Sequence, residues 1–246
     1  MRIGTPAIVC GLRTHGEHGA VVRLMTPDHG LQAAYVRGAR GRRMRPVLIP
    51  GNLVQARLSA RSDAQLAQAE VELTHSRGAL HGEALPAVAI EYATALAATA
   101  LPEAQPYPRL YLALDGLLAA IEAAPAASGW GAALVRYELL LLAELGFGLD
   151  LGRCAVTGTA EDLVAVSPRS GKAVSAGEAE PYQGKLLALP RFLIASDGGA
   201  AWDDIIAGLA LTGHFLARDL LTDRAAPLLE GRGRLVDRLR RAAGVA

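Results

Sequence analysis

Residues 33–58 read AAYVRGARGRRMRPVLIPGNLVQARL, and they place a strongly basic connection between two segments that alternate like β-strands. The central stretch, residues 37–45, has two glycines, no acidic residue and five arginines: Arg37, Arg40, Arg42, Arg43 and Arg45. A predicted strand anchors this charge at each end. The remaining sequence has to explain why a small sheet carries so much positive charge on one connection.

Similar short segments, separated by glycine-rich turns, continue on both sides up to about residue 80. The predicted strands are residues 5–13, 20–26, 31–38, 52–60 and 65–73. Five short strands in about 70 residues fit a small closed barrel, for which the five-stranded OB-fold is the natural candidate.

After about residue 80, the apolar residues recur at helical spacing instead of alternating. Helices are predicted over residues 83–101, 107–124, 129–146 and 201–221, and in the last ~20 residues. Glycine, serine, proline and short β-like pieces interrupt them. We therefore expect an α+β multidomain chain, with an OB-fold nucleic-acid-binding domain over residues 1–80. An all-α domain would follow over residues 81–246, interrupted by a small β insert at about 150–190.

The charge is distributed unevenly between these parts. Residues 1–80 contain eleven arginines, no lysine and five acidic residues, a net charge of +6, whereas the remainder carries −5. Arginine outnumbers lysine throughout the chain, so only the clustering of arginines is informative. A basic first third indicates an anionic partner for that part.

Several classes of protein are disfavoured. Cys10 and Cys154 lie far apart in no motif, which favours a reducing compartment over a disulfide scaffold. We find no secretory signal and no apolar run of the ~20 residues that span a bilayer. The sequence therefore predicts a cytoplasmic protein that does not contact a membrane.

Catalytic machinery is not visible either. The sequence has no G-x-S-x-G elbow, no Walker A motif and no Rossmann glycine fingerprint. His15 and His18 could begin a metal site, but without further ligands nearby we interpret them as part of a solvated turn. We expect no enzymatic activity and no cofactor.

The spacing of turns and short strands in the insert is typical of a small zinc ribbon, in which a hairpin joins two knuckle-like turns. Its candidate ligand positions are Cys154, Thr157, Ser175 and Glu178. A structural zinc site needs four thiolate or imidazole ligands, and only one position here supplies a soft ligand. We therefore predict a zinc-finger-like fold that lacks the full ligand set and binds no metal.

Nucleic acid is the partner that best explains the basic stretch. A run of five arginines can also be a solvated, disordered segment, but this one is anchored at both ends and lacks acidic residues. Further arginines of the barrel could extend the patch: Arg2, Arg13, Arg23, Arg57 and Arg61. Tyr35 is the only Phe, Trp or Tyr within residues 1–80, and in a strand it shares a face with Arg37. One aromatic beside many arginines predicts binding with little base selectivity and strong salt dependence.

Four stretches show a resemblance that covers nearly the whole chain: RGARGRRMRPVLIPGNLV (37–54), YELLLLAELGFGLDLGRCAVTG (137–158), VSPRSGKAVS (166–175) and LLALPRFL (186–193). The chain resembles the bacterial RecO family of recombination mediators. The resemblance implies an OB-fold, a helical domain and a zinc-finger-like insert, of whose cysteines only Cys154 is kept here.

The resemblance also implies a role in DNA repair and homologous recombination. Members bind single- and double-stranded DNA, anneal complementary strands, engage the single-strand-binding protein and, with RecR, help to load RecA. The DNA contacts carried over are Arg37, Arg40, Arg42, Arg43 and Arg45, with Tyr35 beside them. Arg136, on an otherwise apolar helix, is a candidate for binding the acidic tail of the single-strand-binding protein. Its alternative role is a structural ion pair with Glu138, Glu144 or another acid.

Three other functions stay open. A general RNA- or DNA-binding OB protein would share the basic barrel but not explain the acidic helical part. A scaffold could use the arginines to grip an acidic protein. A hydrolase would need a nucleophile or metal site that the sequence does not reveal.

Overall fold

The structure is a computed structural model that describes residues 2–62, 65–124, 126–195, 199–222 and 225–244. The chain forms two compact units, residues 1–123 and 124–246. The division at residue 80 that the sequence suggested stays a prediction.

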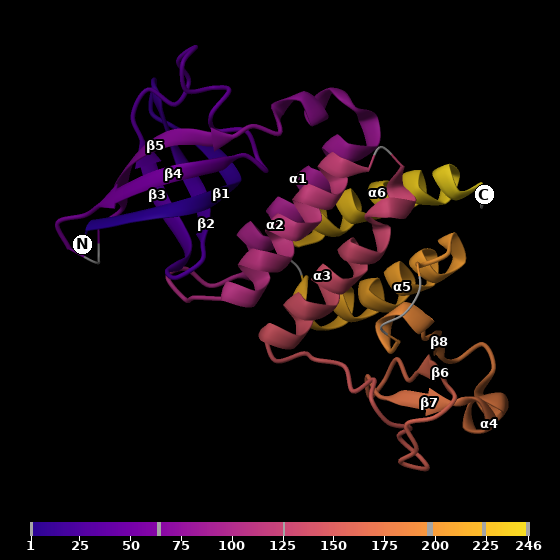
Figure 1. Ribbon diagram of the computed structural model, residues 1–246. Coiled ribbons are helices and arrows are strands. Elements are labelled where there is room, and N and C mark those ends of the chain that lie inside the picture. The colour runs from indigo at the N-terminus through magenta and orange to yellow at the C-terminus, as the bar shows by residue number, and fades with distance from the viewer. Residues whose placement is uncertain (1, 63–64, 125, 196–198, 223–224, 245–246) are drawn as a thin grey trace. The chain divides into compact units, whose positions relative to one another are not determined.

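The first unit contains the five predicted strands. They are β1 (Arg2–His15), β2 (Gly19–Thr26), β3 (Gly30–Val36), β4 (Leu53–Ser59) and β5 (Ala67–His75). These strands close into a barrel in the order β1-β2-β3-β5-β4 (Figure 1). The predicted five-stranded OB-like barrel followed by helices is thereby confirmed.

The interior of the barrel is filled by small side chains that alternate along the strands. Val9, Val22 and Val54 are fully buried in it, together with several alanines such as Ala34 and Ala56. Closure between β3 and β5 depends on only two residue pairs, Ala34 with Ala67 and Tyr35 with Gln68. Small inward residues allow a barrel of this narrow diameter to close.

Helices complete the first unit. A short 3-10 helix, η1 (Gly78–Gly82), leads from β5 into α1 (Ala84–Ala100) and α2 (Pro108–Ala123), and α1 packs against β1. Cys10 of β1 is buried, and burial raises the pKa of its thiol to about 12. This thiol is therefore chemically inert at neutral pH.

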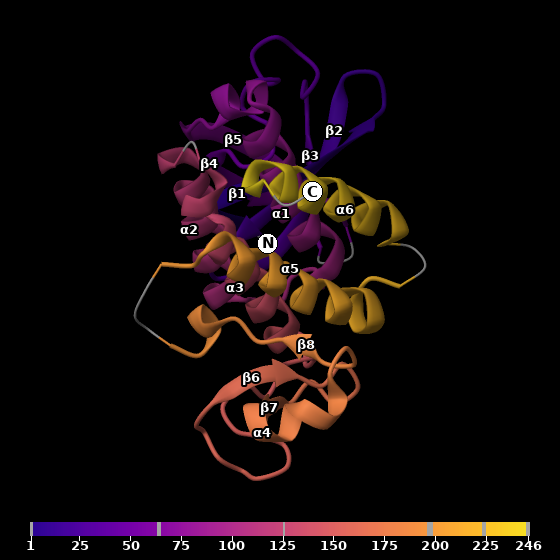
Figure 2. The same cartoon turned by 90° about the vertical axis from the view of Figure 1, so that its right-hand side faces the viewer.

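The second unit is helical with a small sheet. Its elements are η2 (Ala127–Gly129), α3 (Gly131–Glu144), β6 (Leu163–Val166), β7 (Ala173–Ser175), α4 (Ala176–Ala179), η3 (Glu180–Tyr182), β8 (Leu187–Ala188), η4 (Arg191–Leu193), α5 (Trp202–Phe215), the π-helical η5 (Leu216–Leu220) and α6 (Ala226–Ala243). The sheet, in the order β7-β6-β8, lies beside α3 and α5 and away from α6 (Figures 1 and 2). Among all described helices, none has the length and apolar character needed to cross a membrane.

A buried ion pair ties the helices of the second unit together. Glu138 of α3 is fully buried and accepts hydrogen bonds from Arg232 of α6, Nε to Oε1 at 2.7 Å and Nη2 to Oε2 at 2.8 Å. Arg232 Nη2 also donates to the Leu209 carbonyl of α5 at 2.7 Å, and the Thr212 hydroxyl donates to Glu138. Gly213 leaves room for the guanidinium, because a Cβ there would approach Arg232 Nη1 to 2.3 Å. Three helices thus meet at one carboxylate.

Removing the arginine should destabilise the second unit strongly. We expect Arg232→Met to lower the free energy of unfolding by about 3–5 kcal/mol, because the buried Glu138 carboxylate would lose both of its hydrogen bonds to the Arg232 guanidinium. Urea denaturation followed by circular dichroism measures this loss. The exposed pair of Arg240 with Asp237, 3.8 Å apart, supplies the control. Arg240→Met should cost less than about 1 kcal/mol, and an equal effect of both substitutions would contradict the assigned role of Arg232.

Candidate nucleic-acid interface

The connection between β3 and β4, residues 37–52, is a series of tight turns, and we call it the arginine loop. The Gly41 amide donates to the Gly38 carbonyl at 2.9 Å, and the Arg45 amide donates to the Gly41 carbonyl at 3.0 Å. Ala39 and Leu48 are buried in the barrel core. These apolar anchors hold the loop against the barrel, so it is an ordered structure and not a free charge run.

Asn52, at the end of the arginine loop, uses its whole side chain to brace it. The residue is fully buried, and its Nδ2 donates to the carbonyls of Pro46 at 2.8 Å and Val47 at 3.1 Å. Its Oδ1 accepts from the backbone amide of Arg77 at 2.8 Å. One amide therefore fixes the returning half of the loop to the segment that follows β5.

Arg77 is a second brace. Its side chain is only 3% exposed, and Nη1 donates to the Gly51 carbonyl at 2.8 Å. Asp115 and Glu122 of α2 each lie 3.3 Å from its guanidinium, and Glu122 also contacts His75 at 2.9 Å. Arg77 therefore balances its buried charge with two carboxylates and serves structure.

The loop arginines behave differently. All five predicted DNA contacts are exposed: Arg37, Arg40, Arg42, Arg43 and Arg45. Among the described residues, none of them forms an ion pair with a carboxylate. The guanidinium of Arg40 also binds the β1–β2 turn, since its Nη1 donates to the Glu17 carbonyl at 3.0 Å. Exposed guanidinium groups without carboxylate partners are available to bind an anion.

The outer face of the barrel forms a first hollow, which we call the strand hollow. Tyr35 and Arg37 line it together, as their shared strand face predicted, and Arg2 and Arg57 join them. Tyr35 is half-buried, and its ring meets the His15 ring edge-on, with 5.9 Å between the two ring centroids. It also covers Gly19, because a Cβ at that position would lie 2.2 Å from the Tyr35 hydroxyl. Part of its ring is thus already packed, which limits stacking on a base.

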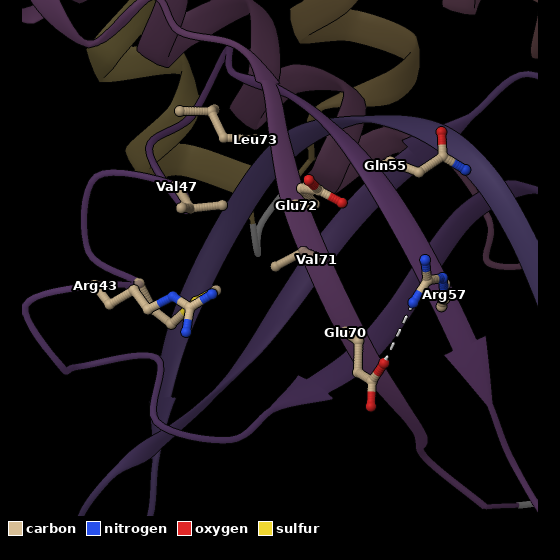
Figure 3. A pocket seen from close by; sticks show the side chains of 9 residues that line it. Arg43, Val47, Gln55, Arg57, Glu70, Val71, Glu72 and Leu73 are labelled. Atoms are coloured by element: carbon tan, nitrogen blue, oxygen red, sulfur yellow. Dashed lines mark ion pairs between the residues drawn. The ribbon is translucent and has the colours of Figure 1, made fainter.

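Figure 3 shows a second hollow, the loop–β5 hollow, between the arginine loop and β5. Arg43 points from the loop towards β5, where Glu70 and Glu72 lie, and Arg57 of β4 lies 4.0 Å from Glu70. Two arginines face two glutamates, so the charge of this hollow is balanced.

A third hollow, the turn hollow, lies between the arginine loop and the β1–β2 turn, which project from the same end of the barrel (Figure 2). Arg40, Arg45 and His18 line it with Glu17. The predicted polar turn therefore belongs to the basic surface, and the described residues contain no group of three or more His, Cys, Asp or Glu side chains able to hold a metal ion.

Arg23, which the sequence offered as an extension of the patch, is engaged elsewhere. It donates to Glu103 at 2.5 Å and to the Ala98 carbonyl. This contact fastens β2 to the segment after α1, and it removes Arg23 from the free positive surface.

Arg136 of α3 is exposed, and the alternative role of a structural ion pair with Glu138, Glu144 or another acid is not what the structure shows. Glu138 binds Arg232 instead, and no described carboxylate lies within ion-pair distance of Arg136. Arg136 donates to the Phe192 carbonyl at 3.0 Å and lies 5.3 Å from the centre of the Phe192 ring. It stands at a groove lined by four leucines and an alanine: Leu139, Leu140, Leu149, Leu193 and Ala143.

The insert brings three of its four predicted ligand positions together, Cys154, Thr157 and Ser175, without forming a zinc-type donor set. Cys154 Sγ accepts hydrogen bonds from the Ser175 hydroxyl at 3.3 Å and the Ser175 amide at 3.4 Å. Hydrogen bonds from Ser175 and Thr157 lower the pKa of Cys154 to about 6. One thiolate with hydroxyl neighbours does not fit a structural zinc ion, and the hairpin is held by these bonds instead.

Comparisons with known proteins agree on one family. The family model "Recombination protein O N terminal" matches residues 1–77, and "Recombination protein O C terminal" matches residues 87–225. The chain is 45% identical to "DNA repair protein RecO" of Phenylobacterium zucineum, with 97% of this chain and 98% of that protein covered. It is 46% identical to the protein of the same name from Rhodospirillum centenum, with 96% and 94% covered.

The brace at Asn52 can be tested directly. Asn52→Ala leaves the Pro46 and Val47 carbonyls and the Arg77 amide without their partner, so we expect a loss of about 1–3 kcal/mol in stability. The loop should then open, and trypsin should cut the native protein faster after Arg40, Arg42 and Arg43. Limited proteolysis with mass spectrometry measures the rate, and Gln68→Ala at an exposed strand position is the control. Equal cleavage of both variants would refute the brace.

Proposed function

The chain belongs to the recombination protein O (RecO) family of DNA repair proteins, and from this premise we propose that it is a mediator of homologous recombination. In this role it binds single- and double-stranded DNA through the arginine loop and anneals complementary strands. The role requires no catalytic step by the protein itself.

One observation carries the proposal: the five exposed arginines of a braced loop have no carboxylate partner among the described residues. A surface that presents several free guanidinium groups attracts phosphate oxygens, which they bind in bidentate fashion. Buried arginines of the same chain, such as Arg77 and Arg232, are neutralised by carboxylates. The contrast supports an external anion as the partner of the loop.

The small aromatic content of the barrel favours annealing over tight storage of a single strand. Tyr35 is the barrel's only aromatic among Phe, Trp and Tyr, and its ring already packs on His15 and Gly19. A strand held by its phosphates keeps its bases free to pair with a complement. Phosphate contacts also exchange with salt ions, so the product can be released.

Mediation involves protein partners as well. We propose that the protein works with RecR to help load RecA on DNA covered by the single-strand-binding protein. The acidic tail of that protein would bind the groove beside Arg136, where the apolar lining receives its apolar side chains and the guanidinium meets a carboxylate.

The DNA proposal predicts a change in salt dependence. We expect a variant with alanine at Arg40, Arg42, Arg43 and Arg45 to bind a labelled single strand more weakly. Each lost phosphate contact should reduce the slope of log K against log salt by about 0.7, so the slope should become shallower by roughly two to three. Fluorescence anisotropy across a salt series measures both quantities.

A charge-matched variant with alanine at Arg169, Arg191, Arg234 and Arg240 is the control, since these exposed arginines lie in the second unit. Its slope should stay close to that of the parent. If the loop variant kept the parental slope, the arginine loop would not be the DNA site, and a scaffold that grips an acidic protein would become the better function.

The partner proposal predicts that Arg136→Ala weakens binding of a synthetic peptide of the acidic tail by about tenfold, or ~1.4 kcal/mol. Isothermal titration calorimetry measures the affinity. Arg234→Ala removes a comparable exposed charge from the same unit and should leave the affinity unchanged. Equal affinities of parent and Arg136→Ala would exclude this groove.

A further inference from the structure

We propose that the arginine loop divides the barrel surface into two separate phosphate-binding subsites, so that one copy of the protein can hold two DNA strands at once. This inference rests on the proposed function and deepens it. The strand hollow and the turn hollow have no lining residue in common. The strand hollow contains the loop residue Arg37, and the turn hollow contains Arg40 and Arg45; none of these three arginines forms an ion pair with a described carboxylate.

The strand hollow is the first subsite. Arg2, Arg37 and Arg57 bring three positive charges to its lining against the single carboxylate of Glu70. The pair of Arg57 with Glu70 is long, at 4.0 Å, and both side chains are at least 75% exposed, so it binds weakly. A phosphate can therefore compete for Arg57. Tyr35 adds a partly covered aromatic ring beside the positions where the DNA phosphates would bind.

The turn hollow is the second subsite. Arg40 and Arg45 come from the loop, and His18 and Glu17 come from the β1–β2 turn. The Glu17 carboxylate lies 3.9 Å from His18 and is highly exposed, so two arginines stand against one carboxylate in this lining. Gly38 and Gly41 also line it, and Gly38 adopts a φ of +68°, a left-handed conformation that favours glycine. Without side chains on these two residues, a phosphate oxygen can approach the loop backbone. Arg40 fixes the geometry through its bond to the Glu17 carbonyl.

The loop–β5 hollow does not make a third subsite. Arg43 and Arg57 there face Glu70 and Glu72 (Figure 3). A phosphate at this position would meet two carboxylates as well as two arginines, so this hollow, unlike the other two, offers no net positive charge to an anion. This balanced hollow adjoins the strand hollow, with which it shares Arg57 and Glu70. A strand on the first subsite is thus kept from spreading over it.

Two subsites on one loop would accelerate annealing. A second strand held by the same molecule meets the first at a raised effective concentration, and the encounter becomes intramolecular. The arginines between the strands lower the repulsion of their phosphates. The bases are not gripped, so complementary sequences can pair.

The test uses two non-complementary single strands of about eight nucleotides, within the size of one OB-fold site, one carrying a donor dye and one an acceptor. We expect the full-length parent to bring both together, giving energy transfer, and native mass spectrometry to show two strands on one protein copy. Arg2→Ala/Arg37→Ala and Arg40→Ala/Arg45→Ala should each still bind one strand but lose the energy transfer. Each should also anneal complementary strands at least tenfold more slowly.

The charge-matched control is Arg191→Ala/Arg234→Ala, since these two exposed arginines of the second unit line neither subsite. It should retain energy transfer. A parent that binds only one strand per copy would overturn the two-subsite inference, as would energy transfer that survives in both subsite variants. Neither outcome touches the proposed function, which fails only if loop substitutions leave the affinity for a single strand and its salt dependence unchanged.

Discussion

The side-chain amide of Asn52 is the constraint on which the basic surface depends. Five like charges in nine residues repel one another, and nothing in that stretch alone selects one conformation. The buried amide fixes the Pro46 and Val47 carbonyls and the Arg77 backbone, while the Asn52 carbonyl accepts from the Val9 amide of β1 at 3.0 Å. Because breaking these bonds would leave buried polar groups unpaired, the loop stays in one arrangement and its arginines keep fixed directions.

Carboxylates decide which arginines of this chain hold the fold and which are free for a ligand. Arg77 and Arg232 are nearly buried, and each is neutralised by acidic side chains from a helix. Arg23 is occupied by Glu103. The loop arginines and Arg136 have no such partner among the described residues. The number of arginines therefore does not indicate a binding site. An arginine that is paired with a carboxylate stabilises the fold, whereas an exposed arginine without such a pair is available to bind a ligand.

Periodicity was enough to predict the strands and helices, because alternation and helical spacing are local properties of the sequence. The brace and the buried pair were not predictable, since Asn52 meets Arg77 across 25 residues and Glu138 meets Arg232 across 94. In the sequence, Asn52 is indistinguishable from an ordinary turn residue, and Arg232 is one of several arginines on an amphipathic helix. The surroundings of Arg136 were not predictable for a related reason: the apolar sequence of its helix does not show that its side chain lies on the helix face that borders the groove. The direction of each loop arginine also depends on long-range contacts, which explains why the sequence suggested one patch where the structure has three hollows.

An annealing protein has to hold DNA without competing with base pairing, and the composition of this barrel meets both demands. Stacking on an aromatic is worth about 1–3 kcal/mol per base, and that energy would have to be given up when the base pairs. Phosphate contacts impose no such cost, because the backbone remains accessible in a duplex. Tyr35, half-buried against His15 and Gly19, is kept from acting as a full stacking platform. Most of the binding free energy of the barrel would therefore come from contacts with phosphates, which single strands and duplex share. Pairing of a bound strand with its complement then costs little binding free energy.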